Sequence, residues 1–138
     1  MGMTPAAMDD VLNRHFEGEE AHDLKAVLAT LTEDIEHDVV GLGVNHGHDA
    51  VTKVYELLFS ETTDEEYKPV RRLHGENHVV DEVLATCLVS GPNVFGPQAV
   101  GKVVTYRLLH VLEFRDGLIS RENVWMDFGA ILAQTTAE

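Results

Sequence analysis

Four long runs of β character follow Pro69, and they constrain the fold of this chain more than any other feature. In these runs apolar or β-branched residues alternate with polar ones, which is typical of strands with one buried face. An Asp-Gly pair at residues 116–117 separates the last two runs and is a strong signal of a tight hairpin. Further turn signals occur at residues 81–82 and 91–92. We predict strands over residues 70–76, 83–90, 102–115 and 118–128.

The first half of the chain has helical spacing instead. Thr4 can cap a helix that begins at Pro5, and the apolar face of this helix repeats at helical intervals as far as His15. Helices followed by antiparallel strands predict an α+β fold with the helices on one sheet face. We expect the remaining elements at these positions: a short helix over 24–31, a strand over 35–40, a glycine-rich loop over 41–47, a helix capped by Asp49 and a helical turn over 130–134.

Length and charge exclude several classes of function. A chain of 138 residues with 44% apolar residues is expected to form one folded domain over residues 1–138. Its net charge of −14 disfavours nucleic acid and anionic membranes as partners, because both attract clustered lysine and arginine. No apolar run is long enough to span a membrane, and no signal peptide is recognisable. The single cysteine, Cys87, cannot form an internal disulfide, so we expect a buried thiol in a cytoplasmic protein.

Two histidines interrupt otherwise apolar faces. His15 lies on the apolar face of the first helix, where it is either a core residue or a catalytic one. His110 shares its strand face with Tyr106 and Leu108. A buried imidazole without a hydrogen bond is costly, so His110 needs a partner in the core or in a ligand.

The stretch "IEHDVVG" places three ionisable residues in one predicted strand, so at least one of them must point inward. Ile35, His37 and Val39 share one face, and this face is typical of packing. Glu36 and Asp38 share the other face and point either to water or into a cavity.

The end of the last strand holds a further candidate. Asp127 shares a face with Asn123 and Trp125, and it is either an acid–base group or a solvated aspartate. Both faces of this strand are mixed in polarity, so the alternation does not identify the inward one.

Metal and cofactor sites are not expected. His46, His48, His74 and His78 could chelate a metal, but their spacing matches no recognised zinc pattern.

The order of elements resembles the nuclear transport factor 2-like superfamily, and most closely its branch of SnoaL-like polyketide cyclases and ketosteroid isomerases. The segments "EHDVVG", "DAV" and "DGLISRENVWMDFGAILAQ" carry this resemblance, which spans residues 8–134. It implies an α+β fold in which three N-terminal helices pack on one face of a cone-shaped, curved antiparallel sheet and enclose a pocket. A shared fold supports function only by analogy.

The resemblance also implies site residues. The segment "HDVVG" places Asp38 where ketosteroid isomerases have their proton-transferring aspartate, three residues before a glycine. His15 and His110 fall where those isomerases have a tyrosine and a protonated aspartate that donate hydrogen bonds. Asp127 matches an aspartate of the cyclases. The segment "ATCLVS" lacks the Arg-x-Asp pair of limonene epoxide hydrolases, so epoxide hydrolysis is disfavoured.

Two functions remain open. In the first, Asp38 removes a proton next to a carbonyl of a small apolar substrate, as in an isomerase or an aldol-type cyclase, while His15 and His110 stabilise the enolate. In the second, the same cavity belongs to a non-catalytic ligand-binding or dimerisation domain. We expect further substrate contacts from the following residues: Tyr55, Tyr106, Asn123 and Trp125.

A homodimer is the expected assembly. The outer face of the strand over 102–115 mixes Thr105 and Arg107 with Val103 and Leu109, a composition typical of an interface. Closed two-fold dimers are also the commonest oligomers.

Overall fold

The three predicted N-terminal helices are present in the computed structural model, which describes residues 2–136. Helix α1 spans Pro5–Glu20, and the Thr4 side chain accepts a hydrogen bond from the backbone N–H of Ala7 at 3.1 Å, as the capping pattern predicted. Helix α2 spans Leu24–Leu28 and is capped by the Asp23 side chain. Helix α3 spans Gly47–Glu61 and therefore begins two residues before Asp49, the predicted cap. Among the described residues no helix is long and apolar enough to cross a membrane.

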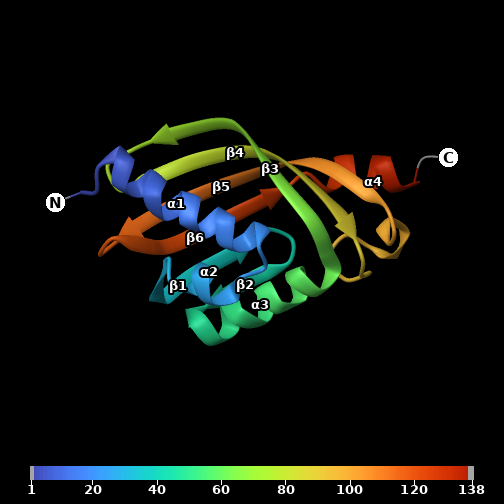
Figure 1. The fold of residues 1–138 in the computed structure, drawn as a ribbon, viewed down its shortest axis with the longest axis horizontal. Helices are drawn as coiled ribbons and strands as arrows, with labels where there is room; N and C mark the ends of the chain where they lie inside the picture. Colours follow the sequence, from blue (N-terminus) through green and yellow to red (C-terminus); the bar gives the residue numbers. More distant parts are fainter. Residues whose placement is uncertain (1, 137–138) are drawn as a thin grey trace.

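Six strands form one curved sheet with the order β2-β1-β6-β5-β4-β3 (Figure 1). Their bounds are β1 Leu31–Val39, β2 Gly43–His46, β3 Thr62–His74, β4 His78–Val89, β5 Val103–Arg115 and β6 Leu118–Met126. A 3₁₀ turn η1 spans Pro97–Ala99, and a fourth helix α4 spans Phe128–Thr136. The predicted α+β class with a curved sheet is confirmed. The expectation of a wholly antiparallel sheet is wrong at one point, because β1 pairs in parallel with β6.

The hairpin between β5 and β6 confirms the Asp-Gly signal. Asp116 and Gly117 have φ values of 54° and 79°, the left-handed backbone of a type I′ turn. The predicted turn at residues 81–82 is wrong, because both residues lie inside β4 and the chain reverses at residues 75–77. Strand β3 begins eight residues earlier than predicted. Its first half is rich in charge, and such a composition is tolerated because β3 is an edge strand.

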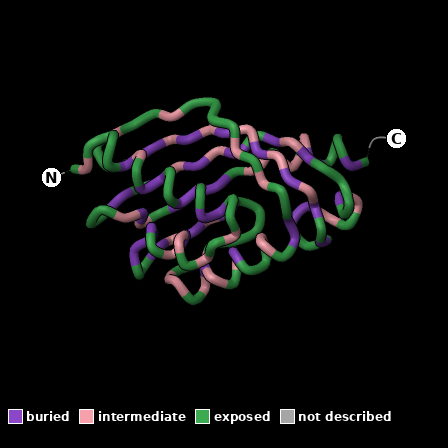
Figure 2. Tube along the Cα trace, in the orientation of Figure 1, coloured by how far each residue is buried: buried purple, intermediate pink, exposed green. Residues whose placement is uncertain are grey.

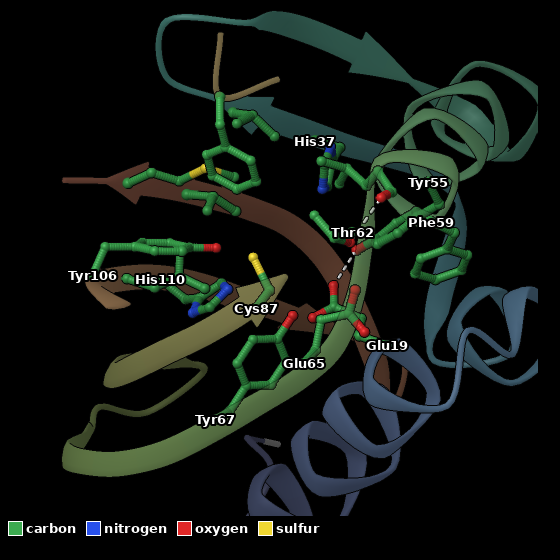
Figure 3. A pocket seen from close by; sticks show the side chains of 16 residues that line it. Glu19, His37, Tyr55, Phe59, Thr62, Glu65, Tyr67, Cys87, Tyr106 and His110 are labelled. Carbon is green, nitrogen blue, oxygen red and sulfur yellow. Dashed lines mark hydrogen bonds between the residues drawn. The ribbon is translucent and has the colours of Figure 1, made fainter. Parts of the chain in front are cut away.

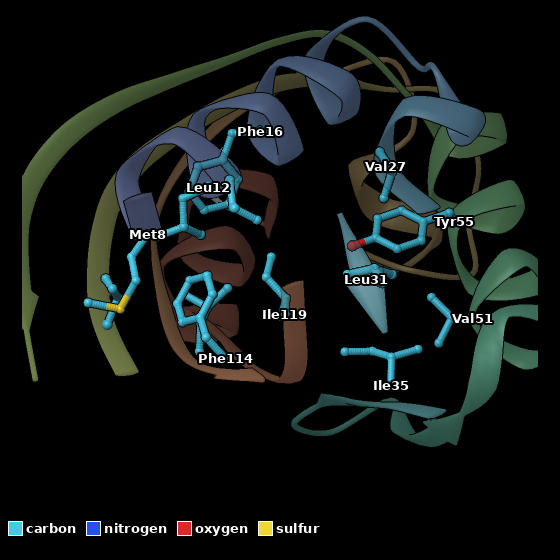
Figure 4. Close-up of a cluster of buried hydrophobic side chains, with 13 residues drawn as sticks. Met8, Leu12, Phe16, Val27, Leu31, Ile35, Val51, Tyr55, Phe114 and Ile119 are labelled. Atoms are coloured by element: carbon cyan, nitrogen blue, oxygen red, sulfur yellow. The ribbon is translucent and has the colours of Figure 1, made fainter. Parts of the chain in front are cut away.

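Buried positions alternate along the central strands, as Figure 2 shows. Helices α1, α2 and α3 pack on the sheet over one apolar cluster, which includes Met8, Leu12, Ile35 and Phe114 (Figure 4). A second apolar cluster surrounds η1 and the adjacent ends of β4 and β5, and includes Val89, Phe95 and Val104. Both clusters lie on the concave side of the sheet, and the candidate site lies where they meet.

Candidate functional site: a polar row and the cavity above it

A row of inward-facing ionisable residues crosses five adjacent strands. His37 on β1 is the register partner of Glu122 on β6. His110 on β5 is the register partner of Asp81 on β4, and Asp81 in turn pairs with Arg72 on β3. Four of the five members are at most 2% exposed: His37, Asp81, His110 and Glu122. We call these five residues the polar row.

The polar row is incompletely satisfied. Five buried side-chain atoms have no hydrogen-bond partner among the described residues, and four of them belong to this row: His37 Nδ1, Asp81 Oδ2, His110 Nδ1 and Glu122 Oε2. Buried polar atoms in native proteins nearly always have partners. Their concentration in one row points to a site that a ligand or water completes.

A cavity of about 60 Å³ lies above the row, between the sheet and α3 (Figure 3). This volume is well above the roughly 10–15 Å³ that a cavity needs to hold one water molecule. Among residues 2–136, no lysine or arginine lines it. The lining residues are Glu19, His37, Val39, Tyr55, Leu58, Phe59, Thr62, Glu65, Tyr67, Cys87, Phe95, Tyr106, Leu108, His110, Val124 and Met126.

His37 resolves the question raised by the three ionisable residues of β1. It shares the buried face of the strand with Ile35 and Val39, as the alternation indicated, but it lines the cavity instead of only packing. Its Nε2 lies 3.6 Å from Glu122 Oε1, while its Nδ1 is unpartnered. A carboxylate near one imidazole nitrogen favours a proton there, which leaves the other nitrogen as an acceptor.

His110 also lines the cavity and is 2% exposed. Burial lowers its pKa, so the imidazole is neutral and donates from one nitrogen only. Its ring packs against Phe16 with a centroid distance of 4.9 Å. Its neighbour Asp81 is held by Arg72 through a bond of 2.7 Å from Nε to Oδ1.

His15 lies directly behind the cavity in a buried network. Thr30 Oγ1 donates to the carbonyl of Val27, so it must accept from His15 Nδ1, which lies 2.8 Å away. His15 Nε2 then faces the carboxylates of Glu122 at 3.2 Å and Glu19 at 3.3 Å. Although burial by itself lowers the pKa of His15, the two carboxylates outweigh it and raise this pKa to about 10.

The same network lowers the pKa of Glu122. Burial acts in the opposite direction, but the charge and hydrogen bond of His15 prevail, so the pair exists as imidazolium and carboxylate. Tyr55 completes the network, because its hydroxyl lies 2.8 Å from Glu19 Oε1 and 3.2 Å from Glu122 Oε1. Tyr55 and Glu19 line the cavity and so connect it with His15.

The opposite side of the cavity carries a carboxylate, two phenols and a thiol. Glu65 contacts His22 at 2.8 Å, and the hydroxyls of Tyr67 and Tyr106 make no hydrogen bond within residues 2–136. Burial, together with nearby carboxylates, raises the pKa values of both tyrosines. Burial and the charge of Glu65 likewise raise the pKa of Cys87 to about 12. These groups therefore stay protonated, and the phenols remain able to donate.

Asp38 is placed differently from the prediction. It lies on the face of β1 opposite His37, where Asn123 Nδ2 donates to its Oδ2 at 3.1 Å. Asn123 also accepts from Arg121 Nε at 2.7 Å. Because β1 and β6 alternate in step, both Asp38 and Asn123 lie outside the cavity. The expectation that His15, Asp38 and His110 line one cavity holds for His110 alone, because Asp38 lies on the opposite face and His15 lies behind Tyr55.

Asp127 and Trp125 also lie outside the cavity. Asp127 is exposed and caps α4, since its Oδ1 accepts from the backbone N–H of Ala130 at 3.0 Å. Trp125 is 40% exposed and lines a shallow groove on the outer face with Arg107 and Leu109. Of the eight predicted site residues, His110, Tyr55 and Tyr106 line the cavity, and His15 contacts its wall.

The histidines considered for a metal site have separate partners. His46 contacts Glu36, His48 contacts the carbonyl of Leu31, and His74 contacts Asp9. In the described part of the chain, the group with the composition of a metal site is His15, Glu19 and Glu122. Its ligand atoms already lie within hydrogen-bonding distance of one another or of Tyr55.

This architecture defines a class of α+β proteins in which helices and a curved sheet enclose an internal polar cavity. The family model of the SnoaL-like domain matches residues 12–122, and the chain belongs to this family. A search of curated protein sequences finds no match.

Several solved structures share the fold. A candidate polyketide cyclase from Xanthomonas campestris pv. campestris is 19% identical, with a TM-score of 0.85 over 95% of this chain and 98% of that one. A protein with a ketosteroid isomerase-like fold from Catenulispora acidiphila was solved in complex with trimethylamine. It is 12% identical, with a TM-score of 0.78 over 99% of this chain and 96% of that one. An LEH-like epoxide hydrolase from M. tuberculosis is 16% identical, with a TM-score of 0.72 over 91% of this chain and 86% of that one. Such different names on one fold mean that the function must be argued from the cavity.

Proposed function

We propose that this protein binds a small, largely apolar carbonyl compound in the cavity and transfers a proton at the carbon next to the carbonyl. The observation that carries this proposal is the unsatisfied polar row beneath the cavity. Two buried imidazoles, His37 and His110, each keep an unpartnered nitrogen and line the same cavity. Folding alone gains nothing from such groups, whereas a ligand with one acidic C–H and one oxygen engages both.

In this mechanism His37 replaces Asp38 as the base. His37 Nδ1 accepts the proton, and the C–H electron pair moves to form the enolate double bond while the carbonyl π pair moves to oxygen. Glu122, 3.6 Å from Nε2, stabilises the resulting imidazolium. His37 then returns the proton to another carbon. In the aldol branch the enolate carbon attacks a second carbonyl, whose π pair moves to its oxygen, and that oxygen takes the proton from His37.

His110 and the phenol of Tyr106 are the donors to the enolate oxygen. Preorganised donors in a dry site contribute about 3–4 kcal/mol each to transition-state stabilisation. The raised pKa of Tyr106 keeps its proton in place, and the low pKa of His110 keeps the ring neutral.

The test is exchange of α-protons in D₂O, followed by NMR on a panel of small ketones. We expect exchange by the wild type and a loss of about 10²–10⁴-fold in His37→Gln, the usual contribution of a general base. Asp38→Asn is the matched control one residue away on the opposite face, and it should keep the wild-type rate. A wild type that binds ketones without exchange would support the non-catalytic alternative, and a rate lost only in Asp38→Asn would reject His37.

A further inference from the structure

The charge of the cavity suggests a narrower class of ligand. Glu19 and Glu65 line it, and no lysine or arginine of the described part of the chain does. Glu65 is held by His22, an imidazole, which carries no permanent charge. On the other side, the imidazolium of His15 is shared between Glu19 and Glu122. Within this part of the molecule the carboxylates therefore outnumber the permanent positive charges.

Aromatic rings form much of the remaining wall. Tyr106 packs against Phe95 with ring centroids 5.6 Å apart, and Tyr55 packs against Phe59 at 5.7 Å. Tyr67 lies between these pairs and faces the same space, with Glu65 beside it (Figure 3). Aromatic faces attract cations, and a carboxylate in a cavity of low dielectric adds to that attraction.

We propose that the ligand of this cavity carries a positive charge, in the form of a substituted ammonium group bound between Glu65 and the tyrosine rings. This inference rests on the proposed function, since it names the class of substrate for the same cavity. Burial is the main cause of the raised pKa values of Cys87 and Tyr67, and the charge of Glu65 raises both further.

A cationic ligand also removes an obstacle to the proposed chemistry. Proton transfer to His37 places the negative charge of the enolate close to Glu19 and Glu65, and like charges at short range disfavour each other. A substrate that carries an ammonium group near the carbonyl offsets the negative charge of the enolate within the same molecule.

The test compares choline with 3,3-dimethylbutan-1-ol, which has the same shape but carries carbon in place of the charged nitrogen. Isothermal titration calorimetry at pH 7 should show choline binding at least about tenfold more tightly. Glu65→Gln should lower the affinity for choline about tenfold and leave the affinity for the alcohol unchanged. Glu66→Gln is the matched control, because Glu66 is the next residue on β3 and is exposed.

A second pair of variants tests how much the aromatic ring of Tyr106 contributes to choline binding. Tyr106→Phe keeps the aromatic face and should keep choline affinity, whereas Tyr106→Leu should lower it. Equal affinities for choline and the alcohol in the wild type would overturn the inference while leaving the cavity a ligand site. Failure of both to bind would overturn it as well, and the proton-exchange assay on ketones would then decide the proposed function separately.

Discussion

The stability of this protein should fall as the pH rises above 6.5, because the buried imidazolium of His15 must then lose its proton. The ordinary pKa of 6.5 applies to the unfolded chain, and the folded pKa is about 10. A raised folded pKa stabilises the protein fully below pH 6.5, and this stabilisation is lost as the pH approaches 10. The difference between the two pKa values of His15 corresponds to at most about 4.8 kcal/mol of folding stability, at 1.36 kcal/mol per pH unit. Between pH 6.5 and 8.5 the loss is about 2 kcal/mol.

The measurement is urea unfolding at about pH 6.5 and about pH 8.5, on the wild type and on the double variant His15→Gln/Glu122→Gln. Replacing both partners removes the proton linkage without leaving Glu122 buried and unpaired. We expect the wild type to lose about 2 kcal/mol more than the double variant over this range. His78→Gln removes an exposed histidine instead and should keep the wild-type slope. Equal losses in the wild type and the double variant would refute the imidazolium assignment.

Three further predictions concern the remaining charged groups and the outer face. Arg72→Met should cost about 3 kcal/mol in urea unfolding, because it leaves the carboxylate of Asp81 buried without its counter-charge; an unchanged midpoint would contradict this. Glu61→Gln should cost about 2 kcal/mol in thermal unfolding, because the carboxylate of Glu61 accepts from both nitrogens of Asn93; an unaltered melting temperature would argue against that role. The protein should be a homodimer built on the outer sheet face, so light scattering should give twice the chain mass, and Trp125→Glu should give the monomer; a monomeric wild type would exclude it.

The helices and the long strands could be predicted because local patterns determine them. The cap at Thr4 and the hairpin at residues 116–117 are each decided within a few residues, and both agree with the structure. Strand β3 was placed too late, since a charged edge strand lacks the alternation on which the prediction depends. The parallel pairing of β1 with β6 is a long-range choice that no local pattern records.

The candidate site was also predictable only where a local pattern in the sequence marks its residues. His15 and His110 were found because each breaks an apolar face in its own segment. His37 was visible too, but its neighbours Ile35 and Val39 made its face resemble simple packing. Glu122 could not be identified, because both faces of β6 are mixed and only the register with β1 shows which one is buried.

The strand register also explains why five polar residues on five different strands form a single site. Within any one strand a single polar residue among apolar ones has an ordinary structural explanation. Only the strand pairing brings them into the polar row, which is displaced by two residues between β5 and β6 and crosses the sheet between the two apolar clusters. Well-packed apolar residues at such positions are often as stable as buried charges or more so. Stability alone therefore does not account for a row whose members retain four unpartnered atoms. His37 and His110 turn their unpartnered nitrogens to the cavity, so the proposed ligand would supply partners for two of the four atoms and a use for the space above the row.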